Sequence, residues 1–224
     1  MSASARPGPP PGQPNPDDGE GAVWPELPLF PLQTVLFPGG LLPLRVFEAR
    51  YLDMVGDCLR RDAPFAVVCL KQGSEVRGAS AQPVRFESVA VLARLLDVDA
   101  EQPGILKLRC QGGPRLALGT PRQRADGLWQ ADARALPADA PAAVPAELAA
   151  GAQALGRAIG ALAAQDQHPF LRPHRLDDAG WVANRWCELL PIPLAAKQRL
   201  MVLDEPALRL KLVVDYLRGQ GVLD

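Results

Sequence analysis

Two histidines and a cysteine near the C-terminal end of the chain are the residue types that could ligate a metal or carry nucleophilic catalysis. His168 and His174 lie six positions apart in the segment HPFLRPHR. A metal site would need further carboxylate or thiolate ligands at a recognised spacing, and the nearest acids do not provide it. A nucleophilic pair of either histidine with Cys187 is conceivable, because Cys–His partners meet in space rather than in sequence. Cys187 lies in an apolar helix-like run, however, where a buried thiol is the commoner role. The sequence therefore predicts no metal site, no cofactor and no catalytic residue.

The lysines do not form a phosphate-binding motif. A P-loop, G-x-x-x-x-G-K-[ST], needs a lysine that reaches the phosphates and a hydroxyl that holds magnesium. None of the four lysines is followed by Ser or Thr: Lys71, Lys107, Lys197 and Lys211. We therefore predict no ATPase site.

Composition favours a cytoplasmic protein. The formal net charge of −1 argues against tight electrostatic binding to nucleic acid or an anionic membrane. We find no signal-peptide pattern and no apolar run of the roughly 18 residues that a membrane-spanning helix needs. The four cysteines form no C-x-x-C pair and each has apolar neighbours: Cys58, Cys69, Cys110 and Cys187. We expect reduced, buried thiols and no membrane contact.

The segment at residues 27–55, LPLFPLQTVLFPGGLLPLRVFEARYLDMV, changes its hydrophobic period halfway along. Apolar residues alternate up to Val46, which is strand spacing, and prolines divide this part into short pieces. From Phe47 onward the apolar residues recur at helical intervals, which predicts a helix over residues 47–61. Two or three short strands should therefore lead directly into a helix.

These residues resemble a known family. The ordered elements LPLFPL, LFPG, LPL and FEARY are similar to the opening of the Lon protease amino-terminal domain, and residues 190–217 resemble its end. The resemblance covers about residues 26–218 and implies a PUA-like β pseudo-barrel with one packed helix. It also implies a substrate-binding domain that stands without its ATPase and peptidase. The Lon peptidase uses a serine activated by a lysine, and no family motif surrounds any serine here: Ser2, Ser4, Ser74, Ser80 and Ser88.

The chain as a whole divides into four parts. Residues 1–22 are rich in Pro and Gly and predict a disordered tail. Residues 23–137 contain further strand-like runs at 65–70, 85–98, 105–110, 115–118 and 128–136, which predict a barrel-like body. Arg115 should lie at a turn exit in a structural role. Residues 138–145 (ADAPAAVP) read as a linker, and residues 146–224 as a helical bundle of four helices. The fold class is therefore α+β.

Binding is the function that remains. We predict a non-catalytic polypeptide-binding module, an adaptor in proteolysis or protein quality control, whose partners are unfolded or partly folded polypeptides. An ATP-dependent protease or self-association is a further predicted partner. The groove between barrel and bundle could hold such a chain. Candidate contact residues are Phe37, Leu41 and Leu42, because an exposed PGG turn would leave their side chains in solvent. The alternatives are an RNA-binding PUA-like protein, which the charge and the few aromatics disfavour, and a hydrolase using His168, His174 or Cys187.

Overall fold

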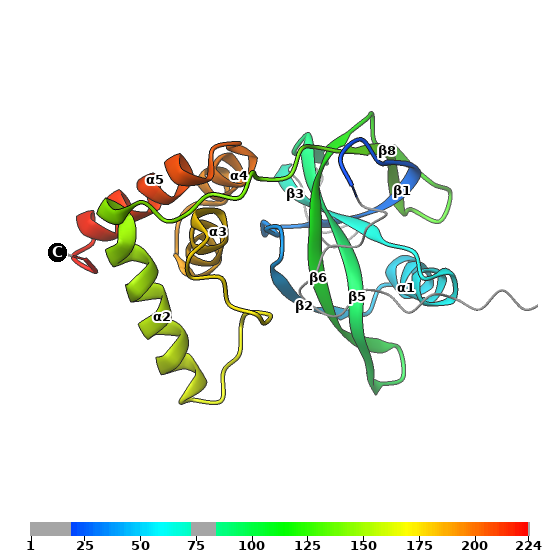
Figure 1. The fold of residues 1–224 in the computed structure, drawn as a ribbon. Coiled ribbons are helices and arrows are strands. Elements are labelled where there is room, and N and C mark those ends of the chain that lie inside the picture. The colour runs from blue at the N-terminus through cyan, green and yellow to red at the C-terminus, as the bar shows by residue number, and fades with distance from the viewer. Residues whose placement is uncertain (1–18, 73–83, 224) are drawn as a thin grey trace, which may run out of the picture.

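The structure, a computed structural model, describes residues 19–72 and 84–223. Within these ranges a β-rich body is followed by a group of helices, and an extended segment joins the two parts (Figure 1). The predicted α+β class is confirmed. Residues 1–18 of the predicted tail lie outside the described residues.

The β-rich body is a barrel-like sheet, as predicted. Its described elements are β1 (Val23–Leu32), β2 (Leu41–Val46), α1 (Ala49–Arg61), β3 (Phe65–Gln72), β4 (Arg85–Phe86), β5 (Val89–Gln102), β6 (Ile105–Leu118), β7 (Arg122–Gln123) and β8 (Trp129–Ala135). The strand order is β2-β6-β5-β3-β1-β8-β7, and β4 pairs with β3. β6 also pairs with β8 through residues 116–118, so the sheet curls back on itself.

The alternation in β1 supplies two apolar clusters, one on each face of the strand. Leu27 and Leu29 belong to a cluster built from alternate residues of β1, β3, β5, β6 and β8, which fills the interior of the curled sheet. Phe30 and Leu32 belong to a second cluster that includes the buried face of α1. Because β3 contributes to both clusters, its run from Phe65 to Leu70 is buried without interruption.

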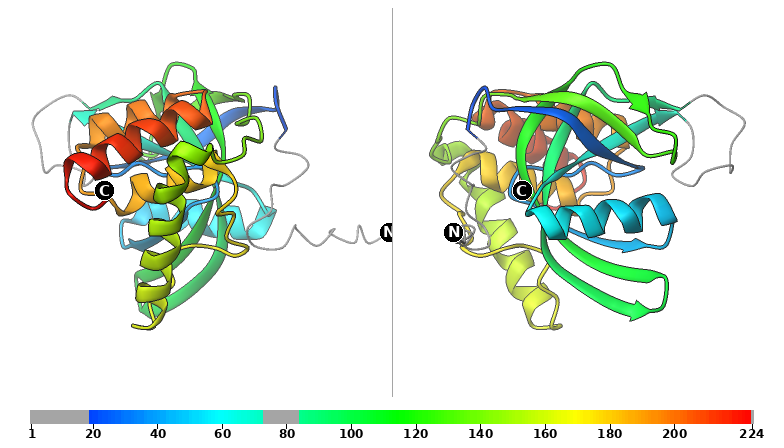
Figure 2. Two further views of the ribbon diagram at one scale, coloured as in Figure 1. Left: turned by 60° about the vertical axis from the view of Figure 1, so that its left-hand side comes forward. Right: turned by 90° about the vertical axis from the view of Figure 1, so that its right-hand side faces the viewer.

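Helix α1 begins two residues later than predicted. Glu48 has an extended backbone (φ −80°, ψ 133°) and forms the N-cap, so the helix begins at Ala49. The side chains of Tyr51 and Met54 are buried, and the Tyr51 ring stacks on Phe30 with 4.2 Å between centroids. The right-hand view of Figure 2 shows the helix beside β2 and the β5–β6 hairpin. The helical period therefore predicted the buried face correctly from Tyr51 to Cys58, but Phe47 and Leu59, which share that period, are 56% and 55% exposed.

The β5–β6 hairpin is longer than predicted, although its ladder contains three register shifts. The predicted strand-like runs stop at residue 98, begin again at 105 and are interrupted between 110 and 115, but β5 runs to Gln102 and β6 continues through Gly112 and Pro114. β6 stays extended because β5 pairs with it along almost its whole length. The turn is confined to Pro103 and Gly104, and Gly104 has a positive φ of +81°. Arg115 accordingly lies within a strand and not at a turn exit.

The C-terminal part contains the four predicted helices and a short 3₁₀ turn. These are η2 (Ala146–Leu148), α2 (Ala149–Ala163), α3 (Ala179–Leu189), α4 (Leu194–Val202) and α5 (Pro206–Gly219). Asp178 caps α3 through a 2.7 Å bond from the backbone N–H of Trp181. A Cβ on Gly151 would lie 2.5 Å from the Val214 side chain, so the glycine lets α2 pack closely on α5. The left-hand view of Figure 2 shows the helices gathered on one side of the sheet.

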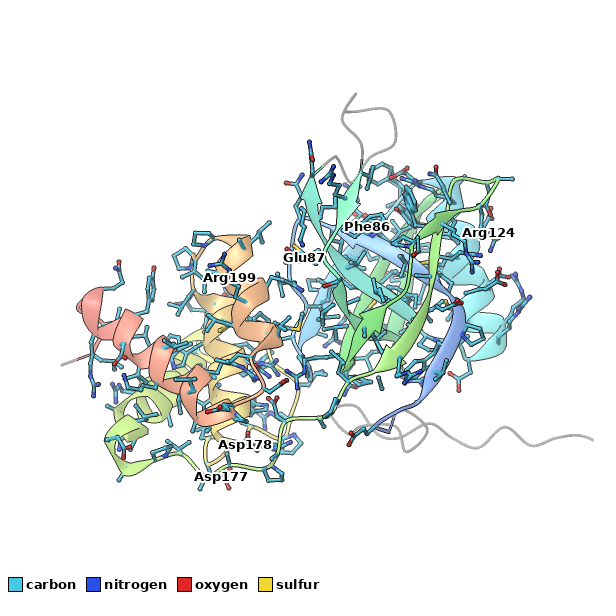
Figure 3. All side chains as sticks on the ribbon, turned by 90° about the horizontal axis from the view of Figure 1, so that it is seen from above. Phe86, Glu87, Arg124, Asp177, Asp178 and Arg199 are labelled. Atoms are coloured by element: carbon cyan, nitrogen blue, oxygen red, sulfur yellow. The ribbon has the colours of Figure 1, made fainter. Side chains whose placement is uncertain are left out.

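The extended segment between the two parts is held in place by hydrogen bonds. The N–H of Ala179 donates to the Ala142 carbonyl at 2.8 Å, and the N–H of Val144 donates to the Asp177 carbonyl at 3.0 Å. Figure 3 shows Asp177 and Asp178 where this segment passes the start of α3. The apolar cluster around α1 also continues into the helices. The two parts therefore share one continuous core.

Candidate functional site

The structure places the predicted contact residues in a packed region. Phe37 is 0% exposed, and Leu41 and Leu42 are half-buried in β2. The N–H of Gly39 donates to the Gly112 carbonyl at 2.8 Å, and the N–H of Gly112 donates to the Gly40 carbonyl at 2.9 Å. The expected exposure of Phe37 is therefore wrong, because the PGG turn folds back onto β6. The exposure of Leu41 and Leu42 is only partial.

Helix α3 covers the same turn through a buried arginine. Arg185 donates from Nη1 to the Gly39 carbonyl at 2.8 Å and from Nη2 to the Pro38 carbonyl at 3.0 Å. Its guanidinium also contacts the Glu188 carboxylate at 2.7 Å. Burial raises the pKa of Glu188 to about 7, although Arg185 opposes this shift. The PGG turn is therefore the part of the β-rich body against which α3 packs.

A groove lies between the β-rich body and the helices, at the side of α4. It encloses about 740 Å³. We call it the interface groove, and its lining residues are Lys71, Glu87, Ser88, Val89, Ala195, Gln198, Arg199, Val202, Leu203, Asp204 and Glu205. Seen from above, Glu87 and Arg199 stand on its two facing sides (Figure 3). The groove that we expected between barrel and bundle is therefore present. The predicted contact residues Phe37, Leu41 and Leu42 do not line it.

The lining combines apolar side chains with charges of both signs. Val202 is exposed (37%), and Val89 and Leu203 are half-buried beside it. Lys71 forms an ion pair of 3.0 Å with Glu87 on the barrel side. Asp204 lies on the helical side with an 84% exposed side chain. Such a surface suits an extended chain, which offers apolar side chains and a polar backbone together.

The residues considered for catalysis are not arranged for it. Cys187 is fully buried, and burial raises the pKa of its thiol to about 12. His168 is exposed and lies 3.6 Å from the Asp166 carboxylate, and the His174 ring packs 5.8 Å from that of Trp181. A thiolate nucleophile at Cys187 is therefore disfavoured. Within residues 19–72 and 84–223, His, Cys, Asp and Glu side chains form no group of three that could hold a metal ion.

All four thiols should be unreactive in the folded protein. Each cysteine is buried and free, and burial raises the pKa of Cys58 and Cys69 to about 11 and that of Cys110 and Cys187 to about 12. Because the thiolate is the reactive form, none of the four thiols should react within minutes with an aromatic disulfide reagent at pH 8. The same reagent in guanidinium should react with all four. One fast-reacting thiol in the native protein would contradict the described burial.

Among the described residues, no helix is long and apolar enough to cross a membrane.

Comparison with known proteins identifies the class. A barrel-like sheet with one packed helix, followed by a helical bundle, also occurs in the Lon N-terminal domain protein from Xanthomonas campestris. That structure is 31% identical in sequence, with a TM-score of 0.67 over 85% of this chain and 98% of the other. The N-terminal domain of the Lon protease from the Mycobacterium avium complex is 15% identical, with a TM-score of 0.59 over 85% and 97% of the two chains, and shows the shared fold.

The family model described as the ATP-dependent protease La (LON) substrate-binding domain matches residues 26–219. The chain belongs to this family, which confirms the resemblance seen in its opening motifs. It is a substrate-binding module of the Lon type. No curated protein in the comparison matches the chain.

Proposed function

We propose that this chain is a non-catalytic module that binds unfolded or partly folded polypeptides in the interface groove, as a cytoplasmic adaptor in proteolysis or protein quality control. The observation that carries the proposal is the groove itself, an open, mixed apolar and charged surface in a domain of the Lon substrate-binding family. Four free, buried cysteines fit a reducing compartment. An ATP-dependent protease that consumes the bound polypeptide is the proposed partner.

The groove sets the expected strength of binding. An extended segment could bury two or three side chains against Val89, Val202 and Leu203, each worth roughly 1.5–3 kcal/mol. Association and ordering of the chain cost several kcal/mol in return. A single site should therefore bind with micromolar or weaker affinity, which suits a module that must release its substrate.

Replacing Val202 by aspartate should weaken binding at least tenfold. Val202 is the large exposed apolar side chain of the groove, and a carboxylate there would be desolvated by an apolar ligand and repelled by Asp204. The measurement is fluorescence polarisation of labelled, reduced and carboxymethylated α-lactalbumin titrated with the protein. Native lactalbumin and a short RNA, each at two salt concentrations, serve as comparison ligands.

Val222→Asp is the matched control, because Val222 is also an exposed valine (52%) and does not line the groove. It should bind like the wild type. Equal affinities for all three proteins would remove the groove as the binding site. Salt-sensitive binding to RNA alone would instead support the RNA-binding alternative.

The adaptor role has a separate test. Addition of the chain to an ATP-dependent protease should change the degradation rate of the unfolded lactalbumin, and Val202→Asp should abolish this change. An unchanged rate despite measurable binding would leave a binding module without an adaptor role.

A further inference from the structure

A buried glutamine connects the two walls of the interface groove. Gln198 of α4 is 5% exposed, and its Nε2 donates a 2.8 Å hydrogen bond to the carbonyl of Val89 in β5. The ladder between β3 and β5 reaches Val67↔Val91, and pairing of β3 resumes at Leu70↔Phe86 in β4. Val89 lies at this interruption, where β3 does not pair with its carbonyl. The side-chain amide of Gln198 supplies the missing hydrogen bond. The bond therefore fixes α4 against the barrel at the groove.

A buried arginine makes a second connection, from β6 to the end of α4. Arg115 has a side chain that is only 3% exposed. Its Nη1 donates to the carbonyls of Met201 at 3.4 Å and Val202 at 3.3 Å, and lies 3.0 Å from the Asp204 carboxylate. Val202 and Asp204 both line the groove. The side chain of Arg115, from the barrel, thus holds the helical wall of the groove at Val202 and Asp204.

The same arginine is tied to the segment that joins the two parts. Its Nη2 donates to the Pro137 carbonyl at 2.8 Å and lies 3.3 Å from the Asp139 carboxylate. The Asp139 carboxylate also forms an ion pair with Nη1 of Arg209 in α5, at 2.6 Å. The guanidinium of Arg115 is therefore surrounded by protein groups and is not placed to contact a ligand. It can act on the groove only through the residues it holds.

We propose that Arg115 and Gln198 are positioning residues that fix the separation of the two groove walls and thereby set the affinity for an extended polypeptide. This inference rests on the proposed function of the groove. Without these bonds, α4 and the α4–α5 connection would still pack on the shared core, but the distance between Val89 and Val202 would be free to vary. A bound chain would then have to order the walls as well as itself, which lowers affinity.

The test combines a distance with a binding constant. Spin labels on Ser88→Cys and Arg199→Cys, exposed groove residues of opposite walls, report the wall separation by electron paramagnetic resonance. The distance distribution is recorded in the labelled parent and after Gln198→Met or Arg115→Lys. Gln123→Met is the matched control, because Gln123 also donates an amide bond to a backbone carbonyl, that of Gly127 at 3.0 Å, away from the groove. Binding of carboxymethylated α-lactalbumin is measured on the unlabelled variants.

We expect both groove variants to broaden or lengthen the distance distribution and to raise the Kd at least fivefold, while Gln123→Met changes neither. Gln198→Met keeps the test available if Arg115→Lys does not fold. An unchanged distance distribution in folded variants overturns the proposal, and so does a changed distribution with an unchanged Kd. If the parent itself does not bind lactalbumin, the proposed function fails, and the distance alone decides whether these residues position the walls.

Discussion

Replacing Asp139 by asparagine is expected to lower the free energy of unfolding by about 3 kcal/mol. Asp139 is the carboxylate shared by two buried arginines, at 2.6 and 3.1 Å from Arg209 and at 3.3 Å from Arg115. The side chains of these arginines are 1% and 3% exposed. Removing one partner of a buried ion pair leaves an uncompensated buried charge, which costs about 3–5 kcal/mol. We choose the lower end because Arg209 keeps its bonds to Asn184 and to the Leu203 carbonyl.

The measurement is urea denaturation followed by circular dichroism, in which the midpoint should fall with little change in slope. Asp204→Asn is the matched control, since Asp204 contacts the same Arg115 guanidinium but its side chain is 84% exposed. An exposed pair contributes about 0–1 kcal/mol, so this variant should stay close to the wild type. Equal losses in the two variants would show that burial does not set the strength of these pairs.

This ion-pair cluster also shows which parts of the structure the sequence could not reveal. Helical periodicity predicted the four C-terminal helices, because each helix buries a stripe that its own residues define. Asp139 lies in a Pro/Ala-rich stretch that reads as a linker, and its partner Arg209 is 70 positions away. No local pattern pairs residues at that separation. The interface groove was hidden for the same reason, since one wall comes from Lys71 and residues 87–89 and the other from residues 195–205.

The PGG turn illustrates a different limit. Glycine beside apolar residues predicted an exposed turn, and the conformation of Gly39, with φ +70°, agrees with a turn. Gly40 has another role, because a Cβ there would lie 2.3 Å from the Glu188 carboxylate. Glycine can indicate backbone freedom or close approach, and sequence alone does not separate the two. Phe37 was consequently predicted at the surface although it lies in the core.

Gly112→Ala should therefore destabilise the protein by about 3 kcal/mol or more. A Cβ on Gly112 would lie 2.3 Å from the Phe37 carbonyl oxygen and 3.2 Å from the Leu36 side chain, and both neighbours are buried. To make room, the turn must move away from β6, which breaks the bonds between Gly39, Gly40 and Gly112 and strains the core. The turn also accepts two hydrogen bonds from Arg185, so α3 would be disturbed with it.

The same denaturation experiment measures this effect, and Gly160→Ala provides the control. Gly160 lies inside α2, and nothing stands within 4 Å of a Cβ built on it. Alanine is favoured over glycine in a helix interior by about 1 kcal/mol, so this variant should equal or exceed the wild type in stability. Opposite signs for two identical substitutions would establish that close packing of the PGG turn on β6, and not the loss of a glycine as such, determines the stability of this region. If the free energy of unfolding of Gly112→Ala lay within about 1 kcal/mol of the wild-type value, the turn would be free to move. The packing of α3 on the barrel would then have to depend on other contacts.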